Sequence, residues 1–189
     1  MSIRAYLKIT AATVILLNVT GCANMALPEP ETVVAGKTWV LAGKIAVKND
    51  STQEGETGYI RWQQVASSYD IQVMGTLGLG AKRLVGNTHQ ATLLDSSGNT
   101  LTAGSPEELM QKNFGWSLPV AAFQDWAQGK AYPHSPSKSH KNASGQVESL
   151  SQFGWQVTFT NYDATGPGFI TLVKPPLRIK LLVSERKSY

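Results

Sequence analysis

Apolar and polar residues alternate with a period of two through most of the chain from Trp39 onward. In the first such stretch Trp39, Leu41, Ile45 and Val47 fall on one side and Lys44 falls on the other. Side chains of a β-strand point alternately to the two faces of its sheet, so this pattern predicts antiparallel strands with one apolar and one solvated face. Turn sequences rich in Gly, Asn, Asp and Ser separate the stretches, and we expect about nine or ten short strands. The alternation recurs in four further stretches: 59–62, 69–73, 155–160 and 177–183.

The middle of the chain carries a helical pattern instead. Ser105-Pro106-Glu107-Glu108 places Ser at the N-cap, Pro at the first helical position and Glu at the third, which is a capping box. A second helix is expected after Pro119, with its end near Gly129. A helical insert at about 105–129 between two groups of strands predicts a mainly β fold, a curved antiparallel sheet or open barrel that the helices cover. The covered face either encloses an apolar cavity or is filled by its own side chains as a solid core.

The first 22 residues have the three parts of a bacterial secretory signal. Two basic residues precede an apolar run at 9–19, which is too short for a transmembrane helix of about 20 residues. The only cysteine of the chain, Cys22, falls where cleavage would occur, in the sequence Val19-Thr20-Gly21-Cys22. This segment is similar to the lipobox of bacterial lipoproteins, which implies that residues 1–21 are removed and that Cys22 is acylated. The alternative is an ordinary signal peptide with a chance cysteine.

Acylation would anchor the chain to a membrane without a spanning helix, because two or more acyl chains bind a bilayer stably. Ala23 follows the cysteine, where an Asp would resemble an inner-membrane retention signal, and this indicates the outer membrane. Residues 22–37 contain two prolines and read as an extended tether of at most about 50 Å. The domain itself is expected at 38–189.

The search for reaction chemistry is mostly negative. One cysteine excludes a disulfide framework and a Cys-rich metal site, and the three histidines have no metal-ligand spacing. No nucleophile motif is present, so we expect no catalytic residues, no metal and no cofactor. The mature chain is only weakly basic once Arg4 and Lys8 are removed, so nucleic acid is not an expected partner. The polar, basic segment Lys130–Gly145 is either a mobile surface loop or a basic edge for an acidic partner.

A glycine-rich segment covers Gly75-Thr76-Leu77-Gly78-Leu79-Gly80. It is not a dinucleotide fingerprint, because Arg83 stands where the third glycine is needed and residues 81–85 read as a strand rather than a helix. Two readings remain for its leucines. They either form an exposed apolar tip that touches something apolar, or both turn inward in a tight hairpin.

Several segments together resemble the LolB family, the outer-membrane receptors of lipoprotein sorting. The resemblance covers nearly the whole mature chain, and it rests on the order and spacing of the segments rather than on any single motif. They are the lipobox at Cys22, then Gly43–Val47, Tyr59–Trp62, Tyr69–Ile71, Gly75–Ala81, Ser105–Met110, Gly115–Val120 with Trp126 and Gly129, and Pro176–Leu181.

The resemblance implies an unclosed antiparallel β-barrel with a helical lid over an apolar cavity. It implies an outer-membrane protein that faces the periplasm, accepts lipoprotein acyl chains from the soluble periplasmic carrier LolA and inserts the lipoproteins into outer-membrane phospholipid without nucleotide. In this family a protruding loop bears a leucine needed for membrane insertion. The matching residue here is Leu77, in Gly75-Thr76-Leu77-Gly78, with Leu79 as a second candidate.

We expect the protein to be a monomer. Two alternatives stay open, namely an anchored lipocalin-like binder of small lipids or fatty acids, and a structural envelope lipoprotein with a solid core. The expected cavity-lining residues are Ile45, Val47, Ile60, Trp62, Ile71 and Val73.

Overall fold

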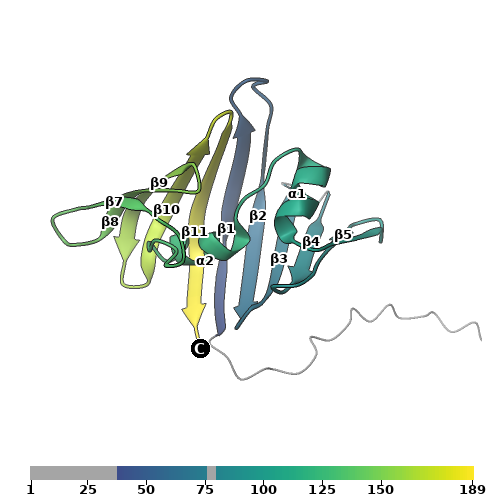
Figure 1. Ribbon diagram of the computed structural model, residues 1–189, viewed down its shortest axis with the longest axis horizontal. Coiled ribbons are helices and arrows are strands. Elements are labelled where there is room, and N and C mark those ends of the chain that lie inside the picture. The colour runs from purple at the N-terminus through teal and green to yellow at the C-terminus, as the bar shows by residue number, and fades with distance from the viewer. Residues whose placement is uncertain (1–37, 76–79) are drawn as a thin grey trace, which may run out of the picture. The chain divides into compact units, whose positions relative to one another are not determined.

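The computed structural model describes residues 38–75 and 80–189, which form one eleven-stranded antiparallel sheet and two short helices. The strand order is β6-β5-β4-β3-β2-β1-β11-β10-β9-β8-β7, so within the described part β6 and β7 are the two edges and the sheet is not closed (Figure 1). The strands are β1 (Thr38–Asn49), β2 (Gly55–Val65), β3 (Ser68–Gly75), β4 (Lys82–Gly86), β5 (Ala91–Asp95), β6 (Thr100–Ala103), β7 (Lys138–Lys141), β8 (Val147–Gln152), β9 (Trp155–Asp163), β10 (Gly166–Lys174) and β11 (Leu177–Ser188).

The chain meanders to one edge of the sheet, crosses over, and meanders back from the other edge. Strands β1 to β6 pair with their neighbours in sequence, and the segment with both helices then leads to β7 at the opposite edge. Strands β7 to β11 return toward the middle, where β11 pairs with β1. The two ends of the described domain therefore meet at the centre of the sheet.

Two glycines in the central strands allow a very close approach of neighbouring backbones. A Cβ at Gly43 would lie 2.2 Å from the carbonyl oxygen of Leu182, and a Cβ at Gly58 would lie 2.3 Å from that of Met74. In the β1–β2 register Gly43 stands opposite Ile60, and Gly58 opposite Ile45. Glycine within a strand commonly marks such a close approach.

Both helices are expected from the sequence, α1 (Pro106–Phe114) from its capping box and α2 (Val120–Trp126) from the pattern after Pro119, although α2 ends at Trp126 rather than near Gly129. Helix α1 begins after Ser105, whose Oγ accepts a hydrogen bond from the Glu108 amide at 3.1 Å. It ends at Gly115, which has φ of +72°, a left-handed conformation that glycine adopts at no steric cost. Helix α2 follows after a short connection. In the described part neither helix is long and apolar enough to cross a bilayer.

The expected strand count was too low, and part of the error lies in the segment Lys130–Gly145. Residues 138–141 of that segment form the edge strand β7, which pairs with β8. All four residues are exposed, so no apolar alternation marks this strand in the sequence. The prediction of a mobile loop is wrong for these four residues.

Both helices lie on the same face of the sheet, which we call the helix face (Figure 1). The opposite face, which we call the open face, carries most of the charged residues of the central strands. The buried apolar residues of strands and helices form one cluster between the sheet and the helices. Its largest fully buried members are Trp62, Trp126, Trp155, Phe159, Leu41, Leu150, Ile170, Leu172, Ile179 and Leu181.

Candidate functional site

Helix α2 fills the middle of the helix face with aromatic rings. Phe123 of α2 stacks on Trp62 of β2, with ring centroids 5.2 Å apart and an interplanar angle of 14°. The ring of Trp39 in β1 also contacts Trp62, with ring centroids 5.4 Å apart. Phe123 is 2% exposed and Trp62 is 1% exposed. An apolar ligand that lies along this part of the sheet must therefore displace α2 side chains.

The six residues expected to line a cavity all point to the helix face. Ile60, Trp62 and Ile71 are buried members of the core cluster. Ile45, Val47 and Val73 are only partly buried and pack against that cluster. The sequence pattern therefore places all six on one face, and the structure divides them into three core residues and three residues at its margin.

The marginal residues belong to a half-buried strip, which we call the apolar rim and define as Ile45, Val47, Val73, Phe114 and Trp116. The Phe114 and Trp116 rings are 5.8 Å apart at the end of α1. The ammonium of Lys82, the residue that pairs with Val73, stands 4.8 Å from the centroid of the Phe114 ring. The rim thus links β1, β3 and the C-terminal end of α1.

The glycine-rich loop leaves the sheet beside this rim. Gly75 ends β3 and pairs with Gly58, which in turn pairs with Ile45 of the rim. The other members of the expected membrane-insertion loop, and the expected acylation site, lie outside the described residues. They are Thr76, Leu77, Gly78, Leu79 and Cys22.

Three polar side chains fix the helical segment, and one of them, Gln152, is fully buried. Gln152 of β8 accepts hydrogen bonds from Trp126 Nε1 at 2.8 Å and from the Tyr132 amide at 3.0 Å. Its own amide nitrogen donates to the carbonyl oxygens of Tyr132 and Ser135. Every hydrogen-bonding group of this 3% exposed side chain is therefore used.

Arg186 fixes the C-terminal end of α2 in a similar way. Its guanidinium donates to the carbonyl oxygens of Ala127 at 2.8 Å and Pro167 at 2.9 Å. Burial lowers the pKa of Arg186, and the nearby Asp163 partly opposes that shift. Glu107 makes the third tie, because its Oε1 accepts a hydrogen bond from the Val120 amide at the start of α2.

Sequence reasoning missed these three ties. Gln152, Arg186 and Glu107 look like ordinary solvated residues in the printed sequence, and Glu107 is already explained by its place in the first turn of α1. One signal was available, since Gln152 falls on the apolar side of the alternation that includes Leu150. A polar residue at a core position needs partners inside the protein.

Tyr69 is a buried polar group of another kind. Its hydroxyl is enclosed but has no hydrogen-bond partner within the described part of the chain. Burial and, second, the negative charge of Glu107 raise the pKa of Tyr69 to about 12. This arrangement leaves one buried, unsatisfied polar group on the helix face.

Several charged groups of the described chain form ion pairs near the surface. Asp70 and Arg83, for example, pair at 2.7 Å across β3 and β4. Over residues 38–75 and 80–189, no group of three or more His, Cys, Asp or Glu residues is placed to hold a metal ion.

An open antiparallel sheet with two helices over its apolar face defines the class of LolA-like folds. A LolA superfamily protein from Nitrosomonas europaea has this fold, with a TM-score of 0.52 and 6% sequence identity over 82% of this chain and 87% of that chain. At such low identity the likeness shows the fold alone.

The sequence comparisons identify the family. The profile described as "Outer membrane lipoprotein LolB" matches residues 37–185, and the chain belongs to the LolB family. The outer-membrane lipoprotein LolB of a Marinomonas species is 28% identical over 165 residues, 84% of each chain. That of Nitrosococcus oceani is 34% identical over 152 residues, 78% of this chain and 75% of the relative. The protein is therefore an outer-membrane lipoprotein and a receptor of lipoprotein localisation, not an enzyme.

Proposed function

We propose that this receptor takes the acyl chains of client lipoproteins from the soluble carrier LolA and holds them on the helix face. It acts as a monomer and then passes the lipoprotein to the phospholipid of the outer membrane without nucleotide. The observation that supports this proposal most strongly is the apolar face between the sheet and its two helices, with a half-buried margin at the apolar rim. Over residues 38–75 and 80–189 the buried polar residues are Gln64 and Gln152, neither of which is charged.

The physical task is to keep acyl chains out of water. Each methylene that is buried contributes about 0.8 kcal/mol, so a lipoprotein anchor with several dozen methylenes would pay tens of kcal/mol if it were fully wetted. The rim offers such a chain a first apolar contact, since Ile45, Val47 and Val73 are only partly covered. Entry beneath α2 then exchanges the contact between Phe123 and Trp62 for contacts with the chain.

Transfer in one direction needs no energy source if the affinity for acyl chains rises from the carrier to the receptor and from the receptor to the membrane. The receptor must bind the acyl chains more tightly than the carrier does, and the membrane more tightly than the receptor. Each step of about 1.4 kcal/mol favours forward transfer tenfold.

Membrane delivery is assigned to two parts of the chain that lie outside the described residues. Acyl chains on Cys22 would anchor the protein, and Leu77 with Leu79 would enter the lipid surface from the loop that begins at Gly75. The position of Gly75 supports this assignment, because it places the start of the loop beside Ile45 of the apolar rim. A chain that leaves the rim would therefore meet the membrane near this loop.

A transfer assay tests the proposal. Carrier loaded with a labelled lipoprotein is mixed with the receptor, which is then pulled down, and the label is expected on the receptor without ATP. A Leu77→Glu/Leu79→Glu variant should accept the label but fail to deliver it to vesicles. Leu101→Glu is the matched control, because Leu101 is also exposed, at 49%, but lies on the edge strand β6.

Two outcomes would contradict the proposal. Label that stays on a competent carrier would remove the receptor role and favour a binder of small lipids. Normal delivery by the double loop variant would remove the assignment of the loop while leaving the helix face intact as the acyl-chain site.

A further inference from the structure

The open face carries a row of side chains that crosses five neighbouring strands. The pairing register aligns Phe169 with Leu182, Leu182 with Lys44, Lys44 with Tyr59, and Tyr59 with Met74. We call this set the open-face row. It runs over β10, β11, β1, β2 and β3, the centre of the sheet, on the side away from both helices.

The apolar members of this row are unusually exposed. Tyr59 and Met74 are each 48% exposed and Leu182 is 47% exposed. Single exposed apolar residues are normal on a protein surface, but contiguous ones mark a contact site. Here Tyr59 and Met74 are adjacent by register, and Lys44 stands between Tyr59 and Leu182, so the row is a candidate contact surface in which apolar side chains flank a cation.

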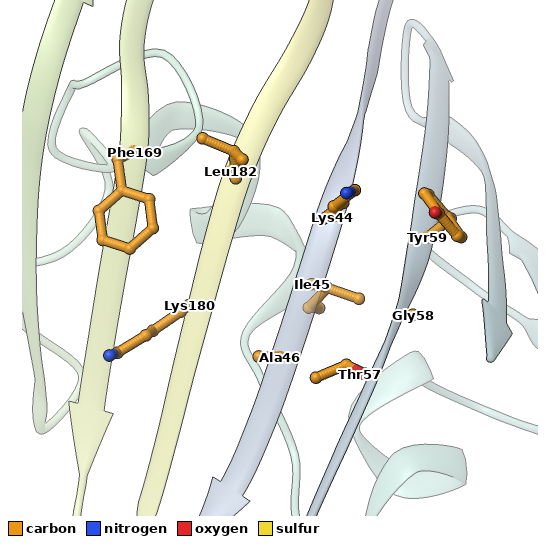
Figure 2. A pocket seen from close by; sticks show the side chains of 9 residues that line it. All are labelled: Lys44, Ile45, Ala46, Thr57, Gly58, Tyr59, Phe169, Lys180 and Leu182. Atoms are coloured by element: carbon orange, nitrogen blue, oxygen red, sulfur yellow. The ribbon is translucent and has the colours of Figure 1, made fainter. Parts of the chain in front are cut away.

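Cations stand within and beside the row. The ammonium of Lys44 lies 5.8 Å from the centroid of the Tyr59 ring. Lys180 belongs to the next rung, where it pairs with Ala46. Figure 2 shows Lys44, Lys180, Tyr59, Phe169 and Leu182 around one hollow of about 390 Å³.

These two lysines form no ion pair with a carboxylate of the described chain, and two acids of β3 and β11 are already engaged. Asp70 is paired with Arg83 at 2.7 Å and Glu185 with Lys187 at 2.6 Å. Among the ion pairs of residues 38–75 and 80–189, none includes Lys44 or Lys180. The centre of the open face therefore presents net positive charge together with exposed apolar surface.

We propose that the open-face row is a docking surface for an anionic phospholipid bilayer. Lys44 and Lys180 would meet lipid phosphates, while Tyr59, Leu182 and Met74 would enter the interface between headgroups and acyl chains. Lysine and tyrosine combine an apolar body with a polar tip, which suits this interface. The protein is an outer-membrane lipoprotein, so a bilayer is always within reach of this face.

This docking surface is separate from acyl-chain transfer on the helix face. It would set the orientation of the domain on the membrane while the receptor awaits a loaded carrier. The test therefore uses neither carrier nor client, and transfer could fail while docking persists.

The experiment places an environment-sensitive fluorophore on the full-length mature lipoprotein reconstituted in vesicles. Thr57→Cys puts the probe in the hollow of the open face. Gln111→Cys puts it at an exposed position of α1 on the helix face. The parent protein, labelled in parallel, reports any reaction of Cys22, the only native cysteine.

On vesicles of phosphatidylethanolamine with phosphatidylglycerol, the probe at Thr57 should shift to the blue and be quenched by a lipid-borne quencher. The probe at Gln111 should show neither effect. A Lys44→Gln/Lys180→Gln variant should lower the docked-to-undocked ratio roughly fivefold for each lysine and about 25-fold for the pair. Lys112→Gln/Lys138→Gln makes the same change of charge away from the row and should leave the ratio unchanged.

Three outcomes would overturn the proposal. The probe at Thr57 could remain water-exposed on anionic vesicles, or it could respond equally on phosphatidylcholine alone and in the double lysine variant. It could also shift only after a soluble partner protein is added to the same vesicles. That third outcome would make the row a protein interface instead.

Discussion

Truncation of Phe123 should weaken the fold and strengthen the binding of an apolar ligand at the same time. Phe123 is 2% exposed and stacks on Trp62 at 5.2 Å, so Phe123→Ala deletes a fully buried ring. Such changes cost about 3–5 kcal/mol. For a domain of this size each kcal/mol lowers the melting temperature by roughly 2–4 °C, so we expect a decrease of roughly 6–20 °C.

Ligand binding should change in the opposite direction because the ring occupies the space that an acyl chain needs. The parent protein must give up the contact between Phe123 and Trp62 when a chain enters, and the variant has already lost it. We therefore expect a fluorescent fatty acid to bind the variant several-fold more tightly, measured by titration at a temperature where both proteins are folded. Leu101→Ala is the control, because Leu101 is 49% exposed on the edge strand β6 and should change neither stability nor binding greatly.

The reasoning would be refuted by a destabilised variant that binds the fatty acid no better, or less well, than the parent. That result would mean that the space beneath α2 is part of a solid core and that acyl chains are held elsewhere. Equal stability of the variant and the parent would instead contradict the packing described between α2 and β2.

Three further predictions concern the scaffold that positions this face. Gly58→Ala should destabilise the protein by roughly 1–3 kcal/mol in urea unfolding, because its Cβ would lie 2.3 Å from a carbonyl oxygen of the neighbouring strand. Gly104→Ala is the control and should be close to neutral, because a Cβ there meets nothing within 4 Å. Equal effects of the two substitutions would contradict the close approach. Gln152→Ala should cost roughly 1–3 kcal/mol for each buried group left unpaired, Trp126 Nε1 among them, and an unchanged melting temperature would show that this tie is dispensable. Tyr69→Phe should be at least as stable as the parent at pH 8, because the hydroxyl has no partner. Since the pKa of Tyr69 is raised to about 12, the parent should keep its full stability below pH 10 and lose stability as the pH rises toward 12. A variant that shows the same loss of stability at alkaline pH would refute the assignment.

The sheet could be predicted from the sequence wherever one face is buried. Trp155, Val157 and Phe159 alternate with polar residues in the sequence, and all three are buried in β9. The capping box predicted the start of α1 correctly, because the N-cap Ser105 and Pro106 are local signals that do not depend on tertiary contacts. The edge strand β7 could not be found in this way, since both of its faces are solvated.

For the candidate site, the sequence predicts only which face of the sheet each residue lies on. Alternation assigns a side of the sheet to Val73 and Trp62, but it cannot tell a core residue from one at the margin, because that depends on where α2 rests. The ties made by Gln152 and Arg186 join segments far apart in the chain. No local pattern contains that information, so the attachment of the helices emerges only from the structure.

The central claim is that acyl chains lie on the helix face, and photocrosslinking tests it most directly. A photoreactive phenylalanine is placed at Val73, on the apolar rim, or at Val173, an equally half-buried valine on the open face of β10. Each protein is mixed with carrier that holds a lipoprotein radiolabelled in its acyl chains, and is then irradiated. We predict a labelled adduct from position 73 and none from position 173. Labelling from position 173 alone, or from neither position after transfer has been confirmed by pull-down, would contradict the account.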